Sequence, residues 1–182
     1  AGSEAPRKIV IEVEPGPIST VRAVDLRFAE PMNSDAAAER QRQRVLRRWS
    51  LKPEAAFTQS EWDGAKNGGL RILQRNRYPT ARIADSQATV LADENRVDLK
   101  VEYDAGQPYR FGALELKGNE RYDAEGIRNI ARIPTGADYS EDELLDAQQR
   151  LANSGYYDSA FLTLDTENSD PQYATVIAQL RE

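Results

Sequence analysis

Residues 107–119, "QPYRFGALELKGN", read as an aromatic and basic lead-in followed by a strict alternation of apolar and charged residues. Leu114 and Leu116 fall on one face of an extended chain, while the charged residues beside them fall on the other. This period of two predicts a half-buried β-strand. Much the same line, "GPISTVRAVDLR" at residues 16–27, occurs ninety residues earlier, so the architecture depends on a repeat.

The repeat extends on both sides of the two matching lines. Residues 9–27 align with residues 99–117 without a gap, and Gly16 is then aligned with Gly106. Each line reads as a strand, a turn containing glycine and a second strand, because glycine can take the positive φ that tight connections need. The end of one unit is therefore predicted to lead directly into the start of the next.

Two helices are predicted between the strands of each copy. The first can begin at Ser34 or Asp35 in one copy and at Asp123 in the other, since these residues cap helix N-termini. The second begins at a capping box in both copies, with Thr58 or Ser140 as the first residue. The spacing predicts that the inward-facing residues are Val45, Leu46, Trp49, Trp62, Ala65, Gly69 and Leu73, then Ile127, Ile130, Ala131, Leu144, Ala147 and Leu151.

Alternating segments that follow the helices predict two more strands per copy, at 81–91 and 96–103 and at 159–166 and 173–180. The fold class is therefore α+β: tandem β-α-α-β-β units, each a three-stranded mixed sheet covered by two helices on one face. The expected units are residues 15–104 and 105–182. Residues 1–14 would be the last strand of a preceding, truncated unit, with a possible cloning scar at 1–3.

The composition excludes several kinds of chemistry. The chain has no cysteine and no histidine, so it lacks thiolate metal ligands, a cysteine nucleophile and the commonest general base. No phosphate-binding loop, dinucleotide motif or serine-hydrolase motif occurs. "DTENSD" at 165–170 lacks the glycine and final glutamate of a calcium loop. We therefore expect no enzyme activity, no cofactor, no metal site and no small-molecule ligand.

Charge is unevenly distributed along the chain. The net charge is −6, which argues against nucleic acid as a partner. Residues 17–103 hold 15 Lys and Arg against 12 Asp and Glu, whereas residues 107–182 hold 7 against 14. The segment "ERQRQRVLRRW" at 39–49 is the most basic, and the interpretation favoured is a solvated helix face, with docking on the acidic second unit as a subsidiary hypothesis.

The two units resemble the POTRA domains of the Omp85 family of outer-membrane assembly proteins. The second unit carries "YRFG", a following "GN" and "SGYYDS", and is similar to the last POTRA domain of the TamA subfamily. The first unit resembles the preceding, middle domain, although "NRYP" replaces its glycine-aromatic turn and Gly68-Gly69 is predicted to weaken its second helix.

This resemblance implies a periplasmic location and attachment to the outer membrane through a C-terminal β-barrel outside this sequence. The implied partners are that barrel, a TamB-like protein anchored in the inner membrane, and nascent outer-membrane proteins or autotransporters. The implied role is to engage a partner or client as an interaction module. Two alternatives remain open: a rigid periplasmic spacer, or POTRA domains of a BamA-like or two-partner-secretion transporter.

The strand after the second helix is a sheet edge in POTRA domains, and an extended client segment can pair with such an edge. The candidate binding residues are Ala81, Arg82, Ile83, Asp85, Ser159, Ala160, Phe161, Leu162, Thr163 and Leu164. Arg82 and Asp85 are plausible charged gatekeepers, and the second edge is the more apolar of the two. A proline at Leu162 or Leu164 is expected to impair engagement. The alternative is that both edges merely face solvent.

A second group of candidates lies at the joint between the units: Gly16, Gly106, Tyr109, Arg110 and Phe111. These residues could set the angle between units or contact the barrel. Ordinary core packing is the favoured interpretation for the two aromatic residues, because aromatic side chains dominate small cores.

Overall fold

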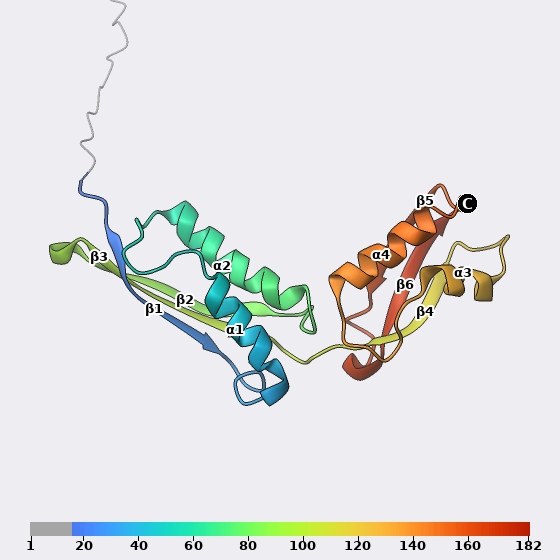
Figure 1. Cartoon of the computed structure of the whole chain (residues 1–182), viewed down its shortest axis with the longest axis horizontal. Helices are drawn as coiled ribbons and strands as arrows, with labels where there is room; N and C mark the ends of the chain where they lie inside the picture. Colours follow the sequence, from blue (N-terminus) through green and yellow to red (C-terminus); the bar gives the residue numbers. More distant parts are fainter. Residues whose placement is uncertain (1–15) are drawn as a thin grey trace, which may run out of the picture.

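The computed structural model describes residues 16–182 and contains two separate three-stranded sheets, each with two helices (Figure 1). The predicted strand of a preceding unit lies outside the described residues. The first unit consists of β1 (Thr20–Phe28), α1 (Glu39–Arg48), α2 (Gln59–Gln74), β2 (Arg82–Leu91) and β3 (Arg96–Asp104). The second consists of β4 (Phe111–Lys117), α3 (Ala124–Ala131), α4 (Glu141–Ala152), β5 (Ser159–Leu164) and β6 (Ala174–Arg181). The predicted α+β class and β-α-α-β-β order are confirmed.

Both sheets have the same topology. The strand orders are β1-β3-β2 and β4-β6-β5, so the last strand of each unit is central. It runs parallel to the first strand and antiparallel to the second. The parallel register shifts after Val21 in one unit and after Phe111 in the other, which are matching positions of the repeat.

The predicted caps begin the helices. Thr58 Oγ1 accepts from the N–H of Glu61 at 3.1 Å, and Ser140 Oγ accepts from Glu143 at 3.4 Å. Asp123 caps α3, and Asp35 caps a short 3₁₀ turn that leads into α1. Each of these oxygens satisfies a main-chain donor that the first helical turn leaves unpaired.

Each unit has its own hydrophobic core between sheet and helices. In the first, Trp49 and Trp62 pack edge to face at 6.3 Å. In the second, Phe111 packs on Tyr139 at 5.6 Å. The predicted interior positions are largely right, but Leu46 is 41% exposed, which corrects the sequence prediction.

The correction at Leu46 has a local cause. The buried face of α1 is formed by Val45, Trp49 and a polar residue, Gln41, one helical turn apart. The Gln41 amide donates to the carbonyls of Leu73 (3.2 Å) and Asn76 (2.6 Å) at the end of α2. This side chain therefore holds the start of α1 against the end of α2.

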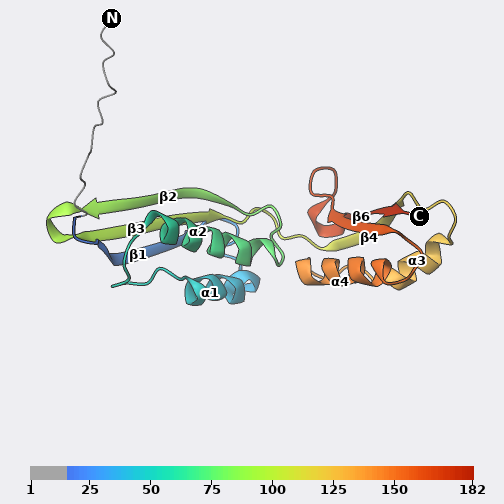
Figure 2. The same cartoon turned by 90° about the horizontal axis from the view of Figure 1, so that it is seen from above.

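The Gly68-Gly69 pair does not interrupt α2, which runs continuously from Gln59 to Gln74. A Cβ on Gly69 would lie 2.2 Å from the Tyr103 hydroxyl, so the helix can approach β3 this closely only with glycine there. The helices of both units lie on the same side of their sheets (Figure 2). Within residues 16–182, no helix combines the length and apolar character needed to cross a bilayer.

Candidate functional site

β2 is a sheet edge along its whole length. Among the described residues 16–182 it pairs only with β3, and no residue of Arg82–Leu91 is buried. Within residues 16–182 we find no side chain that hydrogen-bonds to the backbone of this strand. The outward N–H and C=O groups of a ten-residue strand are thus open to an added strand.

The predicted gatekeepers of β2 act across the sheet rather than along its free edge. Arg82 pairs with Asp104 of β3 at 2.5 Å, and Asp85 lies 3.5 Å from the amine of Lys100. Ile83 is half-buried, and a bulge separates it from Asp85 in the register. Ala81 is buried just before the strand, where its carbonyl accepts from Gln74 at 2.9 Å. The charged side chains therefore leave the main chain of the edge accessible.

β5 is also an edge, but a side chain covers its middle. Gln148 Oε1 of α4 accepts the N–H of Leu162 at 3.0 Å. In an antiparallel ladder, successive residues direct their main-chain groups to opposite sides. The N–H of Asp165 donates to Thr175, so Leu162, three residues earlier, directs its N–H away from β6, toward the free edge. Gln148 therefore already satisfies one of the few main-chain N–H groups that β5 directs toward its free edge.

The side chains of β5 are divided between the core and solvent. Leu162 is 4% exposed and belongs to the core, whereas Phe161 is 58% exposed. The neighbouring candidates Ser159, Ala160, Thr163 and Leu164 are exposed or half-buried. A proline at Leu162 would therefore damage the core and break the bond to Gln148, so its effect could not be assigned to a partner.

The opposite edges, β1 and β4, are each paired at their start by the loop between the two helices. In the first unit Val21 donates to Ala55 at 2.9 Å and accepts from Glu54 at 2.8 Å. In the second, Phe111 donates to Ala137 at 2.9 Å and accepts from Gly136 at 2.7 Å. The sequence repeat does not indicate this pairing, which leaves β2 as the longest open edge in the part of the chain that the structure describes.

The predicted joint residues occupy different environments. Gly16 is exposed at the start of the described residues. Gly106 has a φ of +67°, and its N–H donates to Asp104 Oδ1 at 3.1 Å in a turn between β3 and β4. Tyr109 and Phe111 are buried in the second core, as favoured, while Arg110 lies 3.5 Å from Asp138.

Residues that the sequence analysis missed form most of the joint. Arg77, in the loop after α2, has a φ of +63°, donates its N–H to Tyr139 at 2.9 Å and accepts from Tyr109 at 2.6 Å. Arg75 also joins the units, since its carbonyl accepts from Glu141 at 2.9 Å. Three main-chain hydrogen bonds thus connect the end of α2 to the second unit.

Ion pairs reinforce this joint. The Arg75 guanidinium lies 2.7 Å from Asp142 and 3.3 Å from Glu141, in the first turn of α4. Arg77 Nε lies 3.4 Å from Asp138 without hydrogen-bond geometry, and another nitrogen of its guanidinium donates to the carbonyl of Ala37 at 3.0 Å. The ion pairs from the first unit to the acidic second unit therefore come from arginines that follow α2. Arg40 and Arg44 of the basic helix α1 line a cavity with Asp138 of that unit without forming an ion pair to it, so the subsidiary hypothesis stays a prediction.

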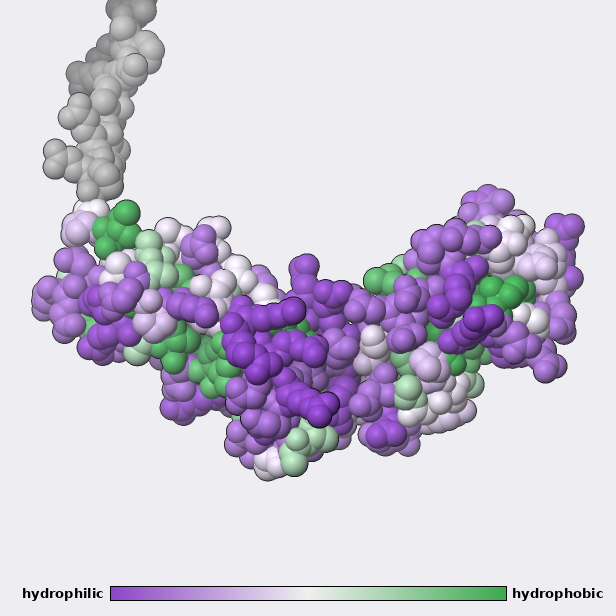
Figure 3. Space-filling view, viewed as in Figure 1, coloured by the Kyte–Doolittle hydropathy of each residue, from purple (hydrophilic) through white to green (hydrophobic). Residues whose placement is uncertain are grey.

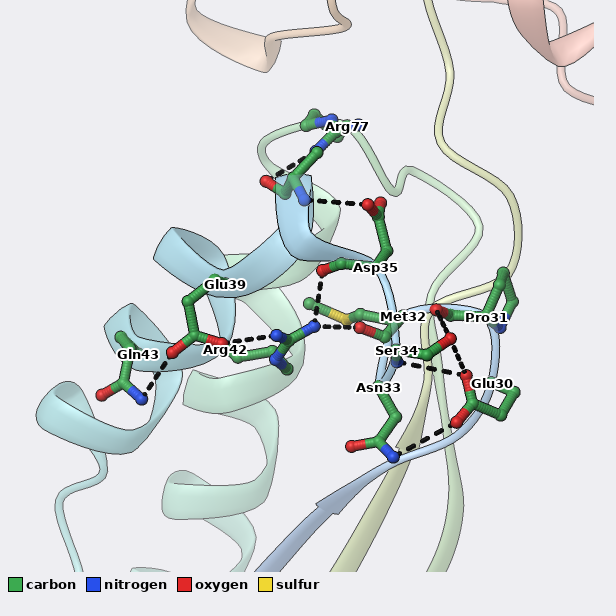
Figure 4. A network of polar contacts seen from close by, with 11 residues as sticks. Glu30, Pro31, Met32, Asn33, Ser34, Asp35, Glu39, Arg42, Gln43 and Arg77 are labelled. Carbon is green, nitrogen blue, oxygen red and sulfur yellow. Dashed lines mark hydrogen bonds and ion pairs between the residues drawn. The ribbon is translucent and has the colours of Figure 1, made fainter.

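Figure 4 shows how the start of α1 is fixed beside this joint. The Arg42 guanidinium donates to the carbonyls of Met32 and Asp35, and it pairs with Glu39. Glu30 accepts from the hydroxyl and N–H of Ser34, and these bonds lower the pKa of its carboxyl. The loop between β1 and α1 is thereby fixed to α1, and its 3₁₀ turn contacts Arg77 through the carbonyl of Ala37.

A family model described as POTRA, surface antigen variable number repeat, matches residues 109–177. The second unit is a POTRA domain. The match covers the region from Tyr109 into β6, including both helices of that unit. The first unit has the same strand order and helix order, so the chain has the fold of tandem POTRA domains.

Solved structures share this fold across both units. A structure of BamA POTRA domains 3–5 from Haemophilus influenzae covers 90% of the chain at 16% identity, with a TM-score of 0.63. BamA from Haemophilus ducreyi lacking POTRA domains 1–3 covers 91% at 19% identity, with a TM-score of 0.65. The N-terminal domain of Omp85 from Thermosynechococcus elongatus covers 91% at 18% identity, with a TM-score of 0.50. The chain spans 61%, 29% and 63% of the chains in these three structures, respectively.

Proposed function

We propose that this chain is a non-enzymatic interaction module of an Omp85-family protein in the periplasm, attached to an outer-membrane barrel. The POTRA match and the tandem fold support this proposal. We further propose that the module binds extended segments of partner or client proteins by adding them as a fourth strand along β2. The observation that carries this choice is the ten-residue open edge of β2.

The two sheet edges named from the sequence are not equivalent. Adding a strand at β5 requires Gln148 to release the N–H of Leu162, whereas β2 needs no such displacement. β5 is also shorter, with six residues, so it offers fewer main-chain hydrogen bonds. Because affinity in strand addition comes from main-chain bonds, β2 is the stronger candidate.

The finer identity that we propose is the TamA subfamily, with these units as its middle and last POTRA domains. Support comes from "YRFG" at 109–112 and "SGYYDS" at 154–159 in the second unit. The corresponding partners are a TamB-like protein anchored in the inner membrane, and nascent outer-membrane proteins or autotransporters as clients. A BamA-like or two-partner-secretion transporter is the alternative, which the reading frame on both sides of this chain would distinguish.

An isotope-labelled sample of this chain, titrated with a synthetic β-strand peptide from an outer-membrane protein, tests the choice of edge. We expect NMR shift changes and slowed amide exchange confined to β2. Proline substitutions at Gln87 and at Ala88 form a matched pair, because adjacent residues direct their N–H groups to opposite sides. One variant should fold normally and lose peptide binding, while the other should lose stability. Shift changes on β5 alone would contradict the proposal.

A second candidate function, a rigid spacer, is favoured by one specific observation. The three main-chain bonds between the loop after α2 and the second unit would hold the two units in one orientation. A spacer tolerates exchange of the exposed side chains of β2 when unit length and joint are unchanged. A binding module with side-chain selectivity does not, so assembly of outer-membrane proteins in cells carrying these exchanges distinguishes the two.

A further inference from the structure

A cavity of about 380 Å³ lies between the helices of the first unit. Two arginines of α1, Arg44 and Arg48, and two at the end of α2, Arg71 and Arg75, line it. We call this cavity the arginine groove. Its remaining lining is Gly68, Ile72, Asn76 and Asp142. The strongly hydrophilic surface over α1 is visible in Figure 3.

The arginines are arranged in two facing pairs. Arg44 and Arg48 are one helical turn apart, as are Arg71 and Arg75, so side chains within each pair project about 5–6 Å apart. The two helices run antiparallel, because Gln41 near the start of α1 contacts the end of α2. The groove thus presents guanidinium groups from both walls at the spacing of successive turns of a helix.

Most of this positive charge has no partner within the described residues. Arg75 pairs with Glu141 and Asp142 of the second unit. For Arg44, Arg48 and Arg71, no carboxylate of residues 16–182 lies within the 4.0 Å that defines an ion pair. The helix dipole favours basic residues in the last turns of α1 and α2. It does not explain why the arginines of both helices line the same cavity.

The second unit provides an internal comparison. Its cavity between α3 and α4, of about 610 Å³, is lined by acidic and basic side chains, including Asp146 and Arg150, and by amide side chains. The Arg150 guanidinium there is occupied, since it donates to the carbonyl of Ala131 at 2.7 Å and 3.1 Å. The arginine lining is therefore a property of the first unit and not a consequence of the shared fold.

We propose that the arginine groove binds an acidic segment of a partner protein, whose carboxylates repeat one helical turn apart. Asp142 already demonstrates the mode of recognition, because this carboxylate, from the first turn of a helix, enters the groove and binds Arg75 at 2.7 Å. Guanidinium groups bind carboxylates in a fixed fork geometry, so a matched row of acids gains specificity as well as attraction.

A membrane surface fits this groove less well. Helices that bind bilayers present large apolar side chains beside their basic residues, so that these can enter the headgroup region. The apolar residue in the groove is Ile72, which is half-buried, and the exposed Leu46 instead lines a separate cavity with Val24 and Trp49. This inference concerns the helix layer and does not depend on strand addition at β2.

The test uses a labelled helical peptide with glutamates one turn apart, and the same peptide with glutamines as its control. Binding is measured by fluorescence anisotropy at low salt. We expect Arg44→Gln and Arg48→Gln each to weaken binding of the glutamate peptide about threefold. Arg47→Gln is the matched control, because Arg47 is on the same helix outside the groove, and it should leave the affinity unchanged.

A second pair of variants tests the cavity itself without changing charge. Open space surrounds the Cβ positions of both Gly64 and Gly68 on α2, but only Gly68 lines the groove. Gly68→Leu should weaken binding, while Gly64→Leu should not, with circular dichroism checking the fold of both. Equal losses for Arg47→Gln and Arg48→Gln, equal binding of the glutamine peptide, or binding of phosphatidylglycerol vesicles in place of the peptide would overturn the proposal.

Discussion

Gln148 of α4 accepts the main-chain N–H of Leu162 at 3.0 Å, in the middle of the β5 edge. This contact makes two otherwise similar edges unequal. A side chain that satisfies an outward donor removes one of the bonds that an incoming strand would form. It also ties α4 to the strand that follows it.

Replacing Gln148 should therefore change β5 locally. Gln148→Ala removes the acceptor, so we expect faster hydrogen exchange of the Leu162 amide and a loss of about 1 kcal/mol in unfolding free energy. Gln148→Glu keeps a side-chain oxygen and should retain slow exchange. If the amide of Leu162 stays equally protected in Gln148→Ala, the contact does not determine the accessibility of this edge.

Adjacent glycines of α2 should respond in opposite directions to alanine. A Cβ at position 69 would lie 2.2 Å from the Tyr103 hydroxyl, which is itself bonded to Lys66, so Gly69→Ala should destabilise by about 1–3 kcal/mol. Position 68 is open, so Gly68→Ala should stabilise the helix by about 0.5–1 kcal/mol. Urea unfolding of the two variants measures both effects. A stabilised Gly69→Ala would contradict the close packing of α2 on β3.

The joint should depend on the backbone of Arg77. Proline cannot take a φ of +63° and has no N–H to donate to Tyr139, so Arg77→Pro should broaden the distances between the two units. Arg77→Gly keeps the N–H and accommodates the positive φ, and should broaden them less. Electron paramagnetic resonance with one spin label in each unit measures these distances. Identical distributions in the wild type and Arg77→Pro would show that the joint is held by other contacts.

Alkaline pH should destabilise the second unit through Tyr139. Burial raises the pKa of Tyr139 from the ordinary 10 to about 12, so the unfolded chain loses this proton at a lower pH than the folded protein. The stabilisation is complete below about pH 10 and is lost as the pH rises through about 12. Tyr139→Phe should reduce this part of the loss. Denaturant unfolding between pH 8 and 11.5 compares the two proteins, and parallel curves would exclude this tyrosine as a cause.

The repeat could be found from sequence because its signals are local. The alternation at Leu114 and Leu116 and the caps at Thr58 and Ser140 depend on neighbours a few residues away, and the structure confirms both. Leu46 was misplaced because spacing alone cannot show that a polar residue, Gln41, occupies the inner face. That choice depends on carbonyl groups thirty residues further along the chain.

The joint and the covered edges could not be predicted in the same way. Arg77 carries no sequence signal for a positive φ, since arginine is not a residue that favours it. The bond between Gln148 and Leu162 and the loops that pair with β1 and β4 arise only when the elements are placed side by side. The basic segment of the first unit was correctly predicted to lie on a helix. That its arginines line one cavity with Arg71 could not be predicted, because this depends on how α2 packs against α1.

In each unit the first strand lies at a border of the sheet and the last strand lies in its middle, and these two strands are parallel neighbours. Pulling the ends of such a unit apart loads the two strands in shear. The hydrogen bonds between them then bear the force together instead of breaking one after another. Such units joined in series would therefore withstand stretching along the chain direction.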